Sequence, residues 1–182
     1  KKEYDIKGTK NVPMYPEQDK VLFPRMAPTG DGESAAQMYQ YWANFYGQPT
    51  FADNIAYFFN YQFNFMYMRY FMWNFAGRQD DYQGTFENQK MNGDWLTGIS
   101  VVDNARLGSQ VGLPKQIADQ KARNTYYLLP LLFGLFGLSY MMQRNKQYAI
   151  VFGLLFLITG LFLIIYFNSP PREPRERDYV FA

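Results

Sequence analysis

The chain of 182 residues contains no cysteine and no histidine. These absences exclude a disulfide, a thiolate nucleophile, a Cys/His zinc site and a Ser-His-Asp triad. Charge is also nearly balanced, with 18 Lys and Arg against 16 Asp and Glu, and residues 1–124 carry thirteen of each sign. This balance does not indicate a nucleic-acid-binding face. What the chain has in excess is aromatic residues, which make up 20% of it.

The most apolar part of the chain is residues 125–168, where two long runs flank the polar link RNKQ. Each run approaches the ~20 residues that a helix needs to cross a ~30 Å hydrocarbon core. The second run has no charged residue from Gln147 to Asn168, and tyrosines lie near the ends of both runs. We therefore expect a transmembrane helical hairpin over 125–168, because a buried hairpin of a soluble protein rarely has uncharged runs of this length. Gly134 and Gly137 predict a face on which another helix packs closely.

The fold class that we predict is mainly α, with the hairpin joined to a loop-rich extramembrane region. Residues 1–33 are rich in Pro, Gly and charge, and are expected to form an extended surface segment. Residues 34–124 are expected to be extramembrane or interfacial. In this region a helix is predicted from Ser34 to Gly47, and its apolar face would contain Ala35, Met38, Tyr39, Trp42, Phe45 and Tyr46.

A second helix is predicted after Thr50, which has Asp53 at the spacing of a capping box. After Asn54, residues 55–75 are almost entirely aromatic or Met, interrupted by three Asn, one Gln and Arg69. These polar side chains would be costly in the middle of a bilayer. We therefore prefer an interfacial or re-entrant helix for residues 54–75, with a third membrane span as the alternative. Residues 76–124 are predicted to be loop with brief helical turns, including a polar helix after Pro114.

Residues 169–182 form a Pro- and Arg-rich segment after the hairpin. Arginines just outside a membrane helix can hold a phosphate through bidentate hydrogen bonds, and this predicts a phosphate-binding role for Arg172, Arg175 and Arg177. The alternative is that these arginines pair with the three acidic residues interleaved among them. Asp80 and Asp81 are adjacent carboxylates that could bind a metal or act as a base, or could simply be solvated.

Several stretches of the sequence resemble one family of membrane proteins. The stretches are LFPRM (22–26), NYQFNFMYMRYFMWNFAGRQDD (60–81), GDWLTGI (93–99), LPLLFGLFGL (128–137) and PREPRERDYVFA (171–182). They resemble large bacterial multi-spanning proteins once described only by a domain of unknown function, which are related to an animal transmembrane protein O-mannosyltransferase. Members of that family are several times longer, so the resemblance implies that this chain is a fragment.

The resemblance implies a glycosyltransferase of the GT-C type in the bacterial inner membrane, with its large loops on the periplasmic side. Such an enzyme transfers a sugar from a polyprenyl-phosphate donor to an acceptor protein. The catalytic carboxylate of GT-C enzymes lies in an early external loop that has no match here, so it is expected outside this chain, with Asp81 as a weak candidate. The resemblance places Arg172, Arg175 and Arg177 at the donor phosphate and Arg78, Gln79 and Asp81 along an adjacent groove. No residue is assigned as a metal ligand and no covalently bound cofactor is expected; the lipid-linked sugar is the donor substrate, and a metal requirement stays open. The expected partners are the lipid bilayer and the remaining helices of the parent chain.

Orientation and function each leave an alternative. The link has two basic residues and the other helix ends have six, so the positive-inside rule would place the termini in the cytoplasm. The family implies the opposite orientation, with the link in the cytoplasm, and we adopt the orientation of the family. The alternative function is a structural or assembly module of a bacterial envelope complex, in which the aromatic helix docks a partner. A transporter is disfavoured, because the hairpin has no ionisable residue at mid-membrane depth.

Overall fold

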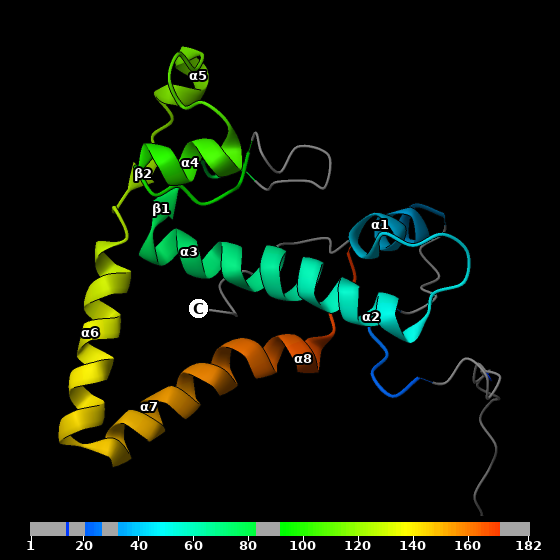
Figure 1. The fold of residues 1–182 in the computed structure, drawn as a ribbon. Coiled ribbons are helices and arrows are strands. Elements are labelled where there is room, and N and C mark those ends of the chain that lie inside the picture. Colours follow the sequence, from blue (N-terminus) through cyan, green and yellow to red (C-terminus); the bar gives the residue numbers. More distant parts are fainter. Residues whose placement is uncertain (1–13, 15–20, 27–32, 83–91, 172–182) are drawn as a thin grey trace, which may run out of the picture.

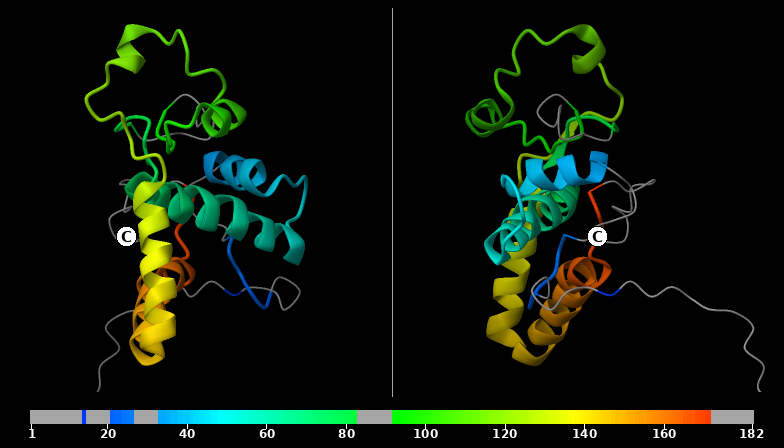
Figure 2. Two further views of the ribbon diagram at one scale, coloured as in Figure 1. Left: turned by 60° about the vertical axis from the view of Figure 1, so that its left-hand side comes forward. Right: turned by 90° about the vertical axis from the view of Figure 1, so that its right-hand side faces the viewer.

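The computed structural model describes residue 14 and residues 21–26, 33–82 and 92–171. The fold is mainly helical. A long helix at residues 51–75 lies at its centre and consists of α2 (Phe51–Tyr57), the π-helical stretch η2 (Phe58–Met68) and α3 (Arg69–Phe75). In Figures 1 and 2, α1 (Glu33–Ala43) and a polar region lie on one side of the long helix, and two apolar helices lie on the other.

The long helix begins as the sequence predicts. The backbone N–H of Thr50 donates to Asp53 Oδ2 at 2.7 Å, and Thr50 Oγ1 accepts from the backbone N–H of Asp53 at 3.4 Å. This capping box satisfies N–H groups that have no partner within the helix. The predicted interfacial helix at residues 54–75 is thus helical throughout, as one continuous element.

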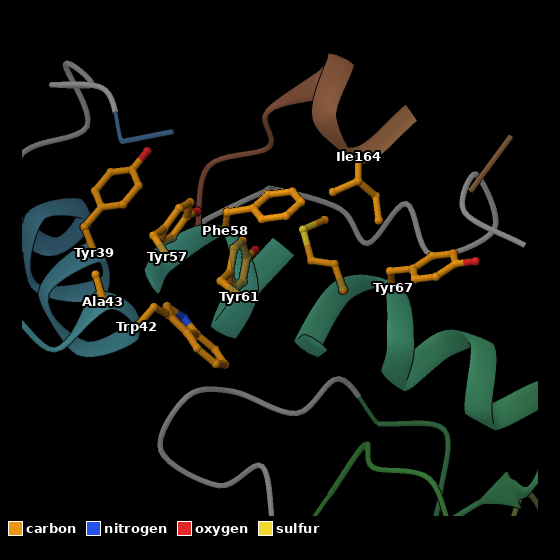
Figure 3. Close-up of a cluster of buried hydrophobic side chains, with 9 residues drawn as sticks. Tyr39, Trp42, Ala43, Tyr57, Phe58, Tyr61, Tyr67 and Ile164 are labelled. Carbon is orange, nitrogen blue, oxygen red and sulfur yellow. The ribbon is translucent and has the colours of Figure 1, made fainter. Parts of the chain in front are cut away.

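An aromatic core joins α1 to the long helix, as Figure 3 shows. The ring of Tyr39 lies 5.0 Å from that of Tyr57, and the ring of Trp42 lies 5.1 Å from that of Tyr61. On the other side of the long helix, Ile164 completes the same core and is 1% exposed. Such tilted ring pairs contribute about 0.5–1.5 kcal/mol beyond the burial of their area.

The helix predicted to extend to Gly47 ends earlier than expected. α1 stops at Ala43, and Asn44 has a φ of +55° in the left-handed region that Asn tolerates. Tyr46 therefore leaves the predicted apolar face and is 93% exposed. Tyr39 and Trp42 keep their predicted places in the core.

A polar region, which we call the loop unit, comprises residues 76–82 and 92–127. Its framework is a small antiparallel sheet of β1 (Gly77–Arg78) and β2 (Asn124–Thr125), with Arg78 also bridged to Trp95. Two short helices, α4 (Ser100–Leu107) and α5 (Lys115–Ala118), lie between these strands in the chain. Gly77 has a φ of +126°, and a Cβ there would lie 2.5 Å from the carbonyl oxygens of Leu96 and Asn124. Only glycine fits this crossing of three backbone segments.

The apolar runs form a helical hairpin at residues 129–167, which is V-shaped in Figure 1. Its first arm is α6 (Leu129–Arg144), and its second consists of α7 (Lys146–Leu157), η3 (Ile158–Phe162) and α8 (Leu163–Phe167). One helix in the described part of the chain, Lys146–Phe167, is long and apolar enough to cross a membrane by length and composition alone.

α6 begins later than the sequence predicts. The backbone N–H of Tyr126 donates to the Ala76 oxygen at 2.8 Å, and that of Tyr127 donates to the Thr97 oxygen at 3.0 Å. These bonds hold the chain extended beyond β2, and Tyr127 and Leu128 then take positive φ values before the helix starts. The first residues of the expected first span thus belong to the loop unit, and the observed helix α6 is 16 residues long.

The long helix packs against the hairpin at Gly160 and not at Gly134 or Gly137, the two glycines for which the sequence predicts close helix packing. At Gly134 and Gly137 a Cβ would meet no atom within 4 Å, whereas a Cβ on Gly160 would lie 2.8 Å from Cε2 of Tyr67. Tyr67 belongs to η2 and is 5% exposed. The long helix therefore approaches the second arm of the hairpin at Gly160.

We expect Gly160→Val to destabilise the protein by about 1–3 kcal/mol more than Gly153→Val, because only the first substitution forces a side chain into Tyr67. Gly153 lies in the same arm and has open space around it, so it controls for the effect of valine on the helix. Guanidinium unfolding of both variants in detergent, followed by tryptophan fluorescence, measures the difference. Equal loss of stability in the two variants would contradict this packing.

Candidate functional site

A cavity of about 150 Å³ lies where the long helix meets the loop unit. Its walls come from two stretches that are distant in sequence, the end of η2 with the start of α3, and the segment from residue 93 to α4. The lining residues are Asn64, Phe65, Arg69, Gly93, Asp94, Trp95 and Arg106. The wall thus contains two guanidinium groups, one carboxylate, one amide and two aromatic rings.

Arg69 is the buried cation of this cavity, with 5% of its surface exposed. Its Nε donates to the Phe65 oxygen at 3.0 Å, and its Nη1 donates to the Gly93 oxygen at 3.1 Å. The guanidinium carbon also lies 4.4 Å from the centre of the Phe65 ring and 4.9 Å from that of Trp73. These contacts fix the guanidinium and connect the long helix to the loop unit.

Arg106 and Asp94 form an ion pair on the opposite wall. Arg106 Nη2 lies 2.7 Å from Asp94 Oδ1, and Arg106 Nη1 donates to the Trp95 oxygen at 3.0 Å. The guanidinium carbon lies 3.3 Å from the centre of the Trp95 ring. Oδ1 of Asp94 also accepts from the Trp95 backbone N–H at 2.7 Å. Among the described residues no donor reaches Asp94 Oδ2, so this oxygen remains available to a ligand.

The chemistry of the cavity suits a small ligand with several hydroxyl groups. Carboxylate oxygens accept hydrogen bonds from hydroxyls, and amides and guanidinium groups can donate to them. Aromatic rings offer flat apolar faces to the carbon skeleton of such a ligand. With two arginines and one aspartate the cavity also has a net positive charge, so an anionic substituent on the ligand is favoured.

The adjacent carboxylates Asp80 and Asp81 have different surroundings. Asp80 is 2% exposed, and its Oδ1 accepts from the backbone N–H groups of Tyr82 and Gly93, both at 2.9 Å. It holds the segment that starts at Gly93 against β1. Asp81 is exposed and pairs with Arg78 at 2.8 Å. The structure thus gives the first carboxylate a supporting role and leaves the second at the surface.

The residues predicted to line a groove are divided between surface and interior. Arg78 and Asp81 pair with each other, with side chains 35% and 64% exposed. Gln79 is 4% exposed, and its Oε1 accepts from the backbone N–H of Asp94 at 3.4 Å. Gln79 therefore does not line the cavity, but it holds the backbone of Asp94, which does.

The remaining site predictions concern residues without a described position. Arg172, Arg175 and Arg177 lie outside the described residues, so their phosphate-binding role stays a prediction. In the described ranges, no group of three or more acidic residues is placed to hold a metal ion.

Sequence reasoning did not assemble Arg69, Asp94 and Arg106 into one site. Arg69 and Gly93 are separated by 24 positions, and Arg106 and Asp94 by 12. Two signals were available: a single arginine in an otherwise aromatic helix, and the Asp-Trp pair in GDWLTGI. Neither signal indicates the other, because the loop unit folds back onto the helix through contacts that have no local pattern.

Comparison with known proteins adds one match. Residues 1–59 match the model of a family of unknown function (DUF8416), which is 59 of the 182 residues. This part contains the predicted extended segment, α1 and the start of the long helix. No curated protein and no solved structure matches the chain.

We expect Asp80→Ala to lower the free energy of unfolding by about 1–3 kcal/mol, because it leaves a buried backbone N–H without an acceptor. Asp81→Ala is the matched control, since an exposed ion pair contributes less than about 1 kcal/mol. Denaturant unfolding of both variants provides the comparison. If Asp81→Ala proved the more damaging variant, the assignment of the two environments would be wrong.

Proposed function

We propose that this chain is a segment of a membrane glycosyltransferase of the GT-C type. It would act in the bacterial inner membrane and transfer a sugar from a polyprenyl-phosphate donor to protein on the periplasmic side. The observation that carries this proposal is the direct connection of an exposed apolar hairpin to a polar unit whose cavity combines arginine, aspartate and aromatic rings. The sequence resemblance supports the same interpretation.

The surface of the hairpin supports its insertion into a bilayer. In an apolar window of 18 residues within the second arm only 11% of the residues are buried, although the arm is 22 residues long and therefore spans about 33 Å. Large apolar side chains on both arms are exposed by half or more, among them Phe133, Phe136, Leu154 and Phe162. An apolar surface of this extent belongs against lipid or other helices. The long helix, which lies across the open end of the hairpin in Figure 1, would then be at the interface.

The first arm indicates what else surrounds the hairpin. With 16 residues, α6 is about 24 Å long and is shorter than a typical hydrocarbon core. Its Gly134 and Gly137 have open space around them. Both facts favour further helices of the parent chain as neighbours of α6, because small residues permit close helix packing in a bilayer.

In this proposal the lipid phosphate and the sugar bind at separate places. Arg172, Arg175 and Arg177 would hold the donor phosphate, and the cavity would hold the sugar hydroxyls through Asp94 Oδ2 and the Asn64 amide. The catalytic carboxylate would come from another part of the parent protein. Asp81 is a weaker candidate for it, because it faces solvent in a pair with Arg78.

Mass spectrometry of the gently purified intact protein tests the proposal. We expect a polyprenyl-phosphate lipid to co-purify with it and to be lost from a variant that combines Arg172→Ala, Arg175→Ala and Arg177→Ala. Asp94→Asn should keep the lipid but lower sugar transfer about 10- to 100-fold, the effect of losing one charged hydrogen bond. Asp119→Asn, at an exposed site beyond α5, should transfer normally.

Two results would contradict the proposal. Retention of the lipid by the triple variant would remove the phosphate role of the tail arginines. Absence of any such lipid, together with a protein partner that remains bound, would favour the assembly module instead.

This chain contains no cysteine, so an introduced cysteine is the only thiol within it and can report orientation. We expect a membrane-impermeant maleimide to label Val111→Cys, which lies in the loop unit at a position that is 85% exposed, in intact spheroplasts. Asn145→Cys, between the two arms of the hairpin, should react only after the membrane is permeabilised. Equal labelling of both variants in intact spheroplasts would show that the hairpin does not cross the membrane.

A further inference from the structure

One turn of the long helix forms a whole wall of the cavity. Asn64, Phe65 and Arg69 line this wall from the end of η2 and the start of α3, and Asp94 and Trp95 of the loop unit line the other. In an α-helix, residues five positions apart point about 140° apart around the helix axis. Asn64 and Arg69 are five positions apart, so an α-helical register would not place both on one wall.

The π-helical register of η2 brings these two residues to the same side. The backbone N–H of Arg69 donates to the Asn64 oxygen, five positions back, and this bond widens the turn. The Phe65 oxygen, which an α-helix would pair with that N–H, instead accepts from Arg69 Nε at 3.0 Å. The π-turn thus builds the wall, and the Arg69 side chain supplies the hydrogen bond that the altered register removes. Such turns are frequent at functional sites.

Asn64 is the residue of this wall whose polar side chain is available to a ligand. The other two asparagines of the aromatic stretch, Asn60 and Asn74, donate from Nδ2 to the oxygens of Trp42 and Tyr70, at 2.9 and 3.0 Å. No hydrogen bond joins the Asn64 side chain to the described residues, and this residue is exposed beside the cavity. Its amide can donate through Nδ2 and accept through Oδ1.

Two available polar groups therefore face a ligand from the two walls. Asp94 Oδ2 can only accept a hydrogen bond, whereas the Asn64 amide can donate or accept. The cavity volume of about 150 Å³ equals that of a protein cavity that holds one benzene molecule, so a single six-membered ring fits between the walls. An epimer of that ring with one hydroxyl inverted would lose a contact and leave a polar group without a partner.

We propose that Asn64 is the specificity-determining residue of this cavity, and that the π-turn positions its amide to select one epimer of a pyranose ring. Asp94 fixes the orientation of the ring, and Asn64 contacts a second hydroxyl. This inference rests on the proposed function for the class of ligand, and adds to it the residue that selects among sugars.

Ligand-observed NMR titrations of the intact protein in deuterated detergent test the proposal. The probes are the methyl α-D-pyranosides of mannose, glucose and galactose, which are uncharged and differ only in the direction of ring hydroxyls. Asn64→Leu removes the amide at nearly constant volume, and Asn64→Ala is a second variant. Neither leaves a described hydrogen-bonding group without its partner. Asn74→Leu is the matched control, because Asn74 is exposed on the same helix and does not line the cavity.

We expect the wild type and the Asn74→Leu control to bind one hexoside about 3- to 10-fold more tightly than the other two, the effect of one hydrogen bond. Both Asn64 variants should bind the three hexosides alike. The proposal is overturned if the wild type binds none of the probes or binds them equally. It is also overturned if the Asn64 variants keep the wild-type preference.

A thermodynamic cycle shows whether the contact with Asn64 is direct. Monodeoxy analogues of the preferred hexoside remove one hydroxyl at a time. One analogue should bind about 3- to 10-fold more weakly than the parent hexoside to the wild type. In Asn64→Leu the same two sugars should bind equally, because the contact is already lost. If every analogue lost the same affinity in the wild type and the variant, Asn64 would make no direct contact and the proposal would fail.

Sugar transfer and the co-purified lipid are measured on the same preparations. An epimer preference that depends on Asn64, in a protein without transfer activity, would support the assignment of the cavity and contradict the glycosyltransferase. Transfer with an epimer preference that does not depend on Asn64 would overturn the present inference alone.

Discussion

The carbonyl groups at the end of a long apolar helix need hydrogen-bond donors, and the rest of this structure depends on how that need is met. α8 ends at Phe167, and Asn168 turns the chain with a φ of +46°. Away from bulk water, the last carbonyls can be satisfied only by other parts of the protein. Here Arg25 donates to the Ile165 carbonyl in the last turn of the helix. The carbonyls just beyond the helix receive donors from the long helix, from Tyr57 and Gln62 to Ser169 and from Tyr61 to Pro170.

These bonds hold the long helix across the end of the hairpin. With that position fixed, Tyr67 meets Gly160 on the hairpin side, and Arg69 reaches Gly93 in the loop unit two residues later. The aromatic excess of residues 54–75 then has a physical explanation, because each side of this helix faces a different layer. Rings fill the core against α1 and α8, and tyrosine hydroxyls supply the donors that an aliphatic helix would lack.

Patterns that act over a few residues were readable in the sequence. The Thr50–Asp53 capping box, the helical character of residues 54–75 and the apolar second arm of the hairpin all follow from local spacing and composition. Contacts between distant segments were not readable. The late start of α6 depends on backbone bonds to Ala76 and Thr97, and the different surroundings of Asp80 and Asp81 depend on Gly93. The cavity likewise forms only when the loop unit folds back onto α3, which no periodicity indicates.

The late start of α6 also couples two parts of the protein mechanically. Tyr126 and Tyr127, at the end of the loop unit, are hydrogen-bonded to Ala76 and Thr97, and only Leu128 separates them from the helix. β2 pairs with β1, and the next residue after β1, Gln79, is bonded through its backbone N–H to the Asp94 oxygen at 3.0 Å. A short helix in a thick bilayer tilts or thins the bilayer around it. In the membrane placement that we propose, a change in the tilt of α6 would pull on the sheet and shift Asp94, so that bilayer thickness would act on the shape of the cavity.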